Sequence, residues 1–353
     1  MNIFLTLKCG FNDSFYFIQQ FSFLNNIQKV FVFRDEKSLE LENVHYILPG
    51  GIRKSFFRLI IRFFQMLFYA PKPGLIVGIY ELPHGLLAVL VGKLRHVPCA
   101  VSIISNPAYT QLRKGIRLKI TLYLLKTCDF VTVTGNNSRN YLIQQGIRAK
   151  KIYVLPNTLD FSAFRKLSIK KEYDIISVGR ISEEKRIEVL VKIVLQLKKS
   201  IPNIKVAIAG TGPKKDEIQG LITNLNLMKN IDVYGYIEPD EKLCEYFNKG
   251  KVFVLTSETE GFPRTIIQAA ACGLPVVASN VGDIEDIVDH NMNGFLVNDY
   301  KNIDEYCKNI IELLNNEKLY KKFSMVLDNK VRDSFISERA ENVWQKIIDE
   351  IGK

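Results

Sequence analysis

The chain has 353 residues, 47% hydrophobic and 24% charged, which is the composition of a globular protein with room for two domains. No apolar run reaches the length that a spanning helix needs, so we expect none. The net charge of +11 lies in the first half. Residues 1–160 hold 20 Lys and Arg against 8 Asp and Glu, and the rest hold 28 against 29. A surface with this bias favours an anionic partner, such as phosphates, a lipid headgroup or nucleic acid.

The start of the chain and the cysteines both favour a cytoplasmic protein. The opening stretch MNIFLTLKCG is too short for a secretory signal and predicts a first buried strand instead. The six cysteines are scattered and include no C-x-x-C pair, which is typical of reduced, buried thiols and not of a disulfide frame or a zinc site. They are Cys9, Cys99, Cys128, Cys244, Cys272 and Cys307.

Short runs rich in Val and Ile alternate with stretches of helical length along the whole chain. In the first half the predicted strands are Ile3–Leu7, Val30–Phe33, Val44–Leu48, Leu75–Ile79, Cys99–Ile104, Phe130–Thr134 and Ile152–Leu155. In the second half they are Asp174–Val178, Lys205–Ala209, Ile231–Tyr234, Val252–Leu255, Val276–Ala278 and Gly294–Val297. The runs lack strict alternation, as strands buried on both faces should, so parallel sheets covered by helices are expected.

The alternating pattern restarts once, after a polar stretch that contains Pro156 and Asn157. We therefore predict an α/β protein of two doubly wound, Rossmann-like domains that face a cleft. Residues 1–156 would form the first domain, 157–172 a linker and 173–333 the second domain. A last helix within 334–353 would cross back onto the first domain. Ligands of open α/β sheets bind beyond the carboxyl ends of the strands, so the site is expected there.

Residues 53–69, RKSFFRLIIRFFQMLFY, predict one helix with an unusual distribution of side chains. Lys54, Arg58, Arg62, Gln65 and Tyr69 fall on one narrow stripe, and almost all the others are apolar. The excess of apolar surface can pack on a neighbouring helix. The alternative is a face that enters a membrane interface, with the cations meeting anionic lipid. We prefer the membrane to nucleic acid, because no nucleic-acid motif or aromatic–basic interleaving appears elsewhere.

Two strand–glycine turns in the second half suit a phosphate group. In SVGRISEEKRIEVLVKIV, Gly179 permits a tight exit from a strand, and Ser182 is a good helix N-cap. Arg180 and Lys185 lie five residues apart across the turn and suit a diphosphate, with solvated charges at a helix start as the alternative. In AIAGTGPKKDEI, Gly210 and Gly212 precede a helix, but the pattern is not a dinucleotide fingerprint. The turn YGYIEPDEKL, which includes Tyr236, is similar.

The stretch TSETEGFPRTIIQAAACGLPVVAS combines a carboxylate, a turn and a helix. Pro263 is well placed near the first helical position, and the free N–H groups there form an anion site. Glu260 just before that start repels phosphate, so it is expected to accept hydrogen bonds from hydroxyls near the phosphate. Gln268, about a turn into the helix, offers both a donor and an acceptor. This arrangement favours a nucleotide sugar, with a core helix after an ordinary turn as the alternative.

The motifs GRISEEK, ETEGFPRTIIQAAACGLPVVASNVGDIEDIV and NGFLV, in this order, resemble the signature of the retaining glycosyltransferase family 4, which has the GT-B fold. The resemblance covers the C-terminal half, and VLPNTLDFSAF is similar to the family's interdomain stretch. It implies a nucleoside-diphosphate sugar in the C-terminal domain and transfer with retention of configuration. Arg180 and Lys185 would neutralise the leaving pyrophosphate, and Glu260 would contact sugar hydroxyls. These three are the expected catalytic residues.

The same resemblance implies the remaining donor contacts. The backbone of Gly261, Phe262, Pro263, Arg264 and Thr265 would lie at the phosphates and the sugar, beside Gly179, Gly210, Gly212 and Tyr236. Gln268 stands where the family usually has a glutamate that bridges the ribose hydroxyls, which predicts altered nucleotide binding and not its loss. No D-x-D triplet occurs in the chain, so no metal and no cofactor are expected.

The first half resembles the family less. Gly10 is the single glycine in the loop after the first strand, and Ile104 and Ser105 stand where many members place a histidine. Glu81, His84 and Asn106 are the other candidates for the acceptor side, and a structural role at a turn is the alternative for His84.

The sequence therefore favours a metal-independent, retaining glycosyltransferase that builds cell-surface polysaccharide. Its partners would be a nucleoside-diphosphate sugar, a saccharide acceptor carried on lipid, and the anionic inner face of the plasma membrane, with no nucleic acid. Two alternatives remain: a catalytically silent relative that binds a nucleotide sugar or a partner enzyme, and an epimerase with the same fold.

Overall fold

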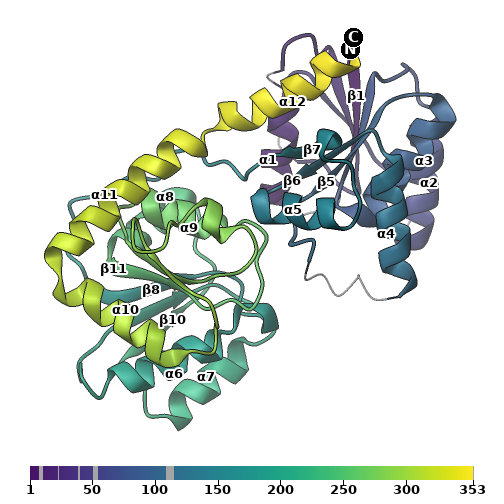
Figure 1. Cartoon of the computed structure of the whole chain (residues 1–353). Helices are drawn as coiled ribbons and strands as arrows, with labels where there is room; N and C mark the ends of the chain where they lie inside the picture. Colours follow the sequence, from purple (N-terminus) through teal and green to yellow (C-terminus); the bar gives the residue numbers. More distant parts are fainter. Residues whose placement is uncertain (8–10, 23, 39, 51–54, 109–114, 353) are drawn as a thin grey trace. The chain divides into compact units, whose positions relative to one another are not determined.

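The structure is a computed structural model that describes residues 1–7, 11–22, 24–38, 40–50, 55–108 and 115–352. The chain divides into two compact units (Figure 1). Unit 1 consists of Met1–Pro156 together with Ser337–Lys353, and unit 2 of Asn157–Ile336. Each unit has its own parallel sheet and its own hydrophobic cores.

Unit 1 is built on a seven-stranded sheet in the order β3-β2-β1-β4-β5-β6-β7. All its pairings are parallel, and Phe4 of β1, for example, lies opposite Phe31 of β2 and Ile76 of β4. The strands are β1 (Asn2–Thr6), β2 (Lys29–Phe33), β3 (Val44–Ile47), β4 (Leu75–Ile79), β5 (Cys99–Ile103), β6 (Phe130–Val133) and β7 (Ile152–Val154).

Helices cover both faces of this sheet, since each face carries buried apolar side chains. One face packs against α1 (Phe11–Ser22) and α12 (Ser337–Ile351), where Phe21 and Trp344 lie 4.5 Å apart between ring centroids. The indole of Trp344 donates to Gln20 Oε1 at 3.1 Å. The other face is covered by α2 (Ser55–Phe68), α3 (Leu86–Arg95), α4 (Ile116–Thr127) and α5 (Asn136–Gln144). The last helix of the chain therefore completes the core of unit 1.

Unit 2 repeats the architecture with a six-stranded parallel sheet in the order β10-β9-β8-β11-β12-β13. The strands are β8 (Tyr173–Val178), β9 (Val206–Ala209), β10 (Ile231–Tyr234), β11 (Gly250–Leu255), β12 (Val276–Ser279) and β13 (Phe295–Val297). One face packs against α6 (Ile187–Leu197), α7 (Lys215–Asn224) and α10 (Ile303–Asn315). The other packs against α8 (Asp240–Asn248), α9 (Arg264–Ala271) and α11 (Glu317–Ser334).

Two parallel, helix-covered sheets confirm the predicted α/β class, and every predicted strand is present within two residues of its predicted ends. Runs of Val and Ile buried on both faces carried that prediction, because only a covered parallel sheet accommodates them.

Two local expectations are wrong. Residues 157–172, predicted as a linker between the domains, belong to unit 2, because Leu159 and Phe164 are buried in its core. Ser182 does not cap a helix with its side chain: its hydroxyl donates to Glu184 Oε1 at 2.6 Å, a single 3₁₀ turn follows at Glu183–Lys185, and α6 begins only at Ile187.

Candidate donor site in unit 2

The predicted site residues of unit 2 stand on loops that leave the carboxyl ends of neighbouring strands. β8 is flanked by β9 on one side and by β11 on the other, so the connections after β8 and β11 run in opposite directions along the sheet. Such a switch point is where open α/β sheets bind ligands. The loop after β8 carries Arg180 and Lys185, and the loop after β11 carries Glu260.

Lys185 and Glu260 meet at this switch point, 75 residues apart in the sequence. Lys185 Nζ donates to Glu260 Oε1 at 2.6 Å, and Ser257 Oγ donates to the same oxygen at 2.6 Å. The two charged side chains are 19% and 9% exposed, so water screens this pair only weakly. In the described part of the chain, Glu260 Oε2 takes no hydrogen bond. The sequence placed both residues in the site, but it did not predict that the cation is paired with the carboxylate.

A second set of bonds holds the two loops together just beside that pair. Thr256 Oγ1 donates to the carbonyl oxygens of Lys185 at 3.2 Å and Arg186 at 3.1 Å, and Glu258 N donates to Glu184 O at 2.9 Å. Arg186 forms an ion pair with Glu258, with Nε donating to Oε2 at 2.7 Å. Burial pulls the pKa of Arg186 down, but the bonds and charge of Glu258 outweigh it and leave that pKa raised. Our sequence reasoning missed Arg186 and Glu258; their signal was the unusual density of charge in both loops.

The glycine turn after β9 lies against the turn after β8. A Cβ atom on Gly210 would stand 1.9 Å from the carbonyl oxygen of Gly179, and one on Gly212 would stand 2.2 Å from that of Ile181. The backbone of Gly210 has φ +145°, a region that other residues rarely adopt. Ile181 N donates to Thr211 O at 2.8 Å. The two predicted phosphate turns are therefore one joined backbone surface, and only glycine permits the close approach.

The other cation and the aromatic residue of the prediction are exposed. Arg180 directly follows Gly179 and makes no hydrogen bond or ion pair with any residue that the structure describes. Tyr236 follows β10 and is 65% exposed. Both side chains are therefore free to move onto a ligand at this end of the sheet.

The loop and helix after β11 follow the sequence prediction closely. Pro263 precedes α9, which starts at Arg264, includes Thr265 and Gln268, and is followed by Gly273 with φ +78°. The ring of Phe262 is buried against Phe335, and Asn157 Nδ2 donates to its carbonyl oxygen at 2.7 Å. The side chain of Phe262 thus packs in the core and holds the turn in place. The side chain of Gln268 is 8% exposed and makes no hydrogen bond to another described residue.

The loop after β12 supports the Glu260–Gly261 turn from the other side. Asp283 N donates to Gly261 O at 3.0 Å. Gly282 has φ +62°, and a Cβ atom there would stand 2.1 Å from Glu260 O. Our sequence reasoning assigned neither residue to the site. The sequence VGD after a buried strand was the available signal.

The acceptor-side candidates of unit 1 are less open than expected. His84 is 1% exposed, and its Nδ1 lies 2.9 Å from Thr6 Oγ1 and 3.4 Å from Arg62 Nη1. Glu81 is also buried, and Asn106 Oδ1 accepts from Ala108 N at 2.9 Å in a local turn. Gly10 lies outside the described residues. The structure therefore places His84 inside a polar network at the ends of β1 and β4. This position favours the structural role at a turn, which was the alternative for His84.

Arg58 and Arg62 of the predicted helix 53–69 bind Asp35 inside unit 1, so the expectation that the cations of this helix meet anionic lipid is wrong for these two. Arg62 is 2% exposed and donates to Asp35 Oδ1 at 2.6 Å, and Arg58 donates to Asp35 Oδ2 at 2.9 Å. Burial lowers the pKa of Arg62, against the opposing effect of Asp35. Gln65 donates to Leu48 O at 2.9 Å. Lys54 lies outside the described residues. The polar stripe of α2 thus faces the protein because Asp35, at the end of β2, binds it.

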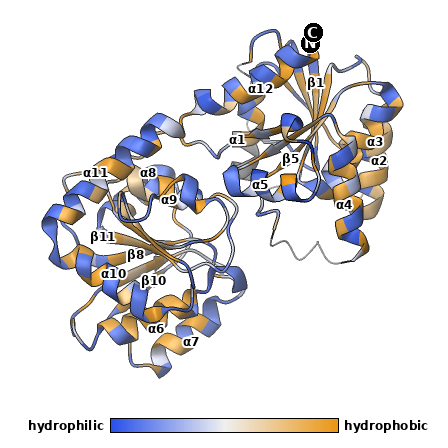
Figure 2. Cartoon of the chain, in the orientation of Figure 1, coloured by the Kyte–Doolittle hydropathy of each residue, from blue (hydrophilic) through white to orange (hydrophobic). Residues whose placement is uncertain are grey.

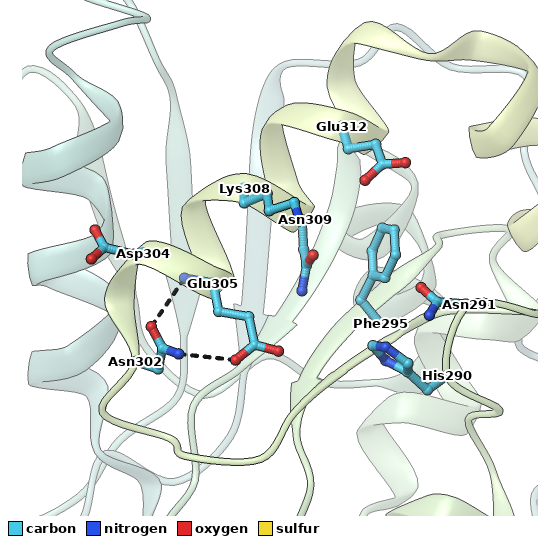
Figure 3. Close-up of a pocket in the computed structure, with 9 residues that line it drawn as sticks. All are labelled: His290, Asn291, Phe295, Asn302, Asp304, Glu305, Lys308, Asn309 and Glu312. Carbon is cyan, nitrogen blue, oxygen red and sulfur yellow. Dashed lines mark hydrogen bonds between the residues drawn. The ribbon is translucent and has the colours of Figure 1, made fainter.

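A hollow of about 440 Å³ lies elsewhere in unit 2, between α10 and the segment that leads into the edge strand β13. Figure 3 shows Glu305, Asn309, Phe295 and His290 around it. None of the predicted site residues lines this hollow.

No group of three or more His, Cys, Asp or Glu side chains is placed to hold a metal ion in the part of the chain that the structure describes. The described cysteines, Cys99, Cys128, Cys244, Cys272 and Cys307, are free and buried. Among the described helices, none is long and apolar enough to cross a bilayer.

Solved structures with the same architecture identify the fold class. The structure of Anabaena Alr3699/HepE in complex with UDP matches with a TM-score of 0.81 over 99% of both chains, at 17% identity. The same protein with UDP-glucose gives a TM-score of 0.82. The chain therefore has the GT-B fold, as its sequence predicted.

Sequence comparison then gives the family. Residues 160–325 match the model of the family Glycosyl transferases group 1. An uncharacterized glycosyltransferase of Haemophilus influenzae is 31% identical over 214 residues, which are 60% of this chain and 59% of that protein. The amylovoran biosynthesis glycosyltransferase AmsD of Erwinia amylovora is 25% identical over 283 residues, 77% of each chain. The match lies within unit 2, so unit 2 carries the domain of the glycosyl transferases group 1 family.

Proposed function

We propose that the chain is a retaining glycosyltransferase that moves a sugar from a nucleoside diphosphate to a saccharide acceptor. The observation that carries the proposal is the contact between Lys185 and Glu260 at the switch point of the unit 2 sheet. A cation for phosphate and a carboxylate for hydroxyls stand side by side there, on loops whose backbones are bonded together. Uridine diphosphate is the proposed carrier, because Alr3699/HepE, of the same fold, was solved with UDP and with UDP-glucose.

In this proposal the two cations share the leaving group. Lys185 has three donor hydrogens and uses one on Glu260, so the others are available to a phosphate oxygen. Arg180, exposed and unbonded among the described residues, closes onto the diphosphate from the other side of the turn. Positive charge held at the departing phosphate stabilises the transition state, where negative charge develops. This arrangement needs no metal ion.

Glu260 and Gln268 would bind the two ends of the donor. Glu260 Oε1 accepts from Lys185 and Ser257, which leaves Oε2 for a sugar hydroxyl. Gln268 lies eight residues after Glu260, about one turn into α9, and offers a neutral amide to the ribose. Glycine turns at 179 and 210–212 allow phosphates to approach backbone N–H groups. Together they would fix the donor in one orientation.

The acceptor proposed is a saccharide on a lipid carrier, in the assembly of a cell-surface polysaccharide at the inner face of the plasma membrane. AmsD is named as a glycosyltransferase of amylovoran biosynthesis, which supports a role in biosynthesis. The lipid is supported by the apolar side chains and cations that unit 1 exposes on α2, α3 and α4.

A catalytically silent protein that binds a nucleotide sugar is the second candidate. It is favoured by Gln268 in place of the family's usual glutamate and by the burial of His84. Both candidates predict nucleotide binding, so binding alone does not separate them. Product analysis does, because only the enzyme consumes the donor, and an epimerase would change the donor without an acceptor.

The experiment has two steps. A thermal-shift screen against nucleoside diphosphates and their sugars is expected to give the largest stabilisation with a uridine compound, as binding to the native state raises stability. The best donor is then incubated with and without lipid-linked saccharides, and the products are separated. We expect nucleotide release that depends on acceptor. Binding without any turnover would support the silent protein, and no stabilisation by any nucleotide would contradict both.

A further inference from the structure

The α2 helix is amphipathic with its apolar side turned to solvent. Its polar residues Arg58 and Arg62 bind Asp35 inside unit 1. Phe57, Ile60, Phe64 and Phe68 follow one another at helical spacing on the opposite side, and all are exposed, Phe68 by 76%. A single exposed apolar residue is ordinary, but a whole helix side of them is not.

The two following helices continue this exposed apolar surface. α3 packs against α2 and against α4, on the same face of the sheet. Figure 2 shows hydrophobic residues on all three helices. α3 exposes Leu90 and Leu94, four residues apart, and α4 exposes Ile116, Ile120 and Tyr123 at the same kind of spacing. We call these residues, with Phe56, Phe57, Ile60, Phe64 and Phe68, the apolar face of unit 1.

Cations accompany the apolar face, and exposed carboxylates are scarce beside it. Arg117, Lys119 and Lys126 of α4 are exposed, and so is Lys93 of α3, whose Nζ lies 4.0 Å from Asp129 Oδ1. From residue 43 to residue 128 the sequence holds one acidic residue, Glu81, and its side chain is buried. An occupant of this face must therefore supply both apolar contacts and negative charge.

We propose that the apolar face is a docking surface for an anionic lipid bilayer. The face combines aromatic and aliphatic side chains with Lys and Arg, as interfacial helices do, and anionic headgroups would meet the cations while the side chains enter the acyl boundary. A second copy of the chain fits poorly, because a two-fold interface sets a patch against itself and would oppose like charges. This inference concerns unit 1 alone and holds whether or not unit 2 transfers a sugar.

The direct test is partition of the full chain to vesicles, measured by co-sedimentation. Vesicles of phosphatidylglycerol with phosphatidylcholine are compared with phosphatidylcholine alone, at low and at high salt. We expect binding to the anionic vesicles at low salt, weaker binding at high salt because exposed charges are screened, and weak binding to the zwitterionic vesicles.

Two variants separate the contributions. Phe57→Ser/Phe64→Ser/Phe68→Ser is expected to reduce partition at least tenfold; since Ser and Phe have similar helix propensities and the side chains are exposed, α2 should persist. Arg117→Gln/Lys119→Gln is expected to reduce partition to anionic vesicles about fivefold for each cation. The control Met228→Ser/Met292→Ser/Met325→Ser removes equally exposed apolar side chains of unit 2 and should bind like the unchanged protein. Circular dichroism checks the fold of each variant.

Two results would overturn the proposal. One is anionic-vesicle binding that is absent, or that survives the triple phenylalanine variant unchanged. The other is self-association of the unchanged protein, seen by analytical ultracentrifugation, that the same variant abolishes without any vesicle binding. The second result would assign the face to another copy of the chain.

Discussion

Lys185 and Glu260 neutralise each other's charge, and both side chains are mostly buried. Removing one partner leaves the second charge without its neutralising contact, which is more costly than losing the pair. A substitution of either residue is therefore expected to affect both the stability of these loops and the proposed reaction. The pair also explains how a carboxylate can stand next to the proposed phosphate site, since Lys185 offsets its charge.

Lys185→Ala is predicted to reduce sugar transfer by about 100- to 1,000-fold, the typical effect of removing one group that stabilises developing charge. Lys192→Ala, on the exposed side of α6, is the matched control and should leave the rate unchanged. Steady-state rates with the donor from the nucleotide screen measure the effect. Equal rates for both variants would remove Lys185 from the mechanism.

Gln268→Glu is predicted to tighten nucleotide binding by about fivefold, because a carboxylate makes stronger hydrogen bonds to ribose hydroxyls than an amide does. Gln268→Met keeps the size of the side chain, removes its polar atoms and should weaken binding. Calorimetric titration gives both dissociation constants. A large loss of affinity in Gln268→Glu would show instead that the site requires a neutral side chain.

Most elements could be predicted from the sequence, and their orientations could not. The strands follow from runs such as Val252–Leu255, and α9 follows from Pro263 before it and Gly273 after it. The stripe on α2 was recognised, but periodicity does not say which side of a helix is buried. The ion pairs with Asp35, which lies 23 positions before Arg58, determine that the polar side of α2 faces the protein. The pairing of Lys185 with Glu260 also depends on a long-range contact and could not be predicted.

Gly210→Ala is predicted to destabilise unit 2 by about 2 kcal/mol or more, because the new Cβ atom would stand 1.9 Å from the carbonyl oxygen of Gly179 and the backbone region disfavours alanine. Gly220→Ala is a matched control inside α7, where nothing lies within 4 Å of the new atom. It should stabilise by about 0.5–1 kcal/mol, since alanine favours a helix.

Urea unfolding of the two glycine variants, followed by circular dichroism, measures these changes. Nucleotide affinity should fall in Gly210→Ala and stay constant in Gly220→Ala. If Gly210→Ala is as stable as the unchanged protein, the backbones at Gly210 and Gly179 do not approach each other as closely as in the structure.

At the scale of the whole molecule, each unit has a separate core, and the chain's last helix belongs to the first unit. Trp344 is the one tryptophan of the sequence and is fully buried against Phe21. Its fluorescence therefore reports the folding of unit 1, whereas circular dichroism reports both units.

Trp344→Ala is predicted to destabilise unit 1 by about 3–5 kcal/mol, the usual cost of a large cavity in a core. Thermal unfolding followed by circular dichroism should show one transition at lower temperature and the nucleotide-stabilised transition of unit 2 unchanged. A uniform shift of both transitions would mean that the two units unfold as one.

Hydrogen exchange with the best donor tests the central claim most directly, because it locates the ligand without relying on turnover. The account predicts that the donor slows exchange of backbone amides within residues 179–186 and 256–268, and that Lys185→Ala abolishes this protection. Unchanged exchange in both segments, or protection confined to residues 290–312 around the hollow beside β13, would contradict it.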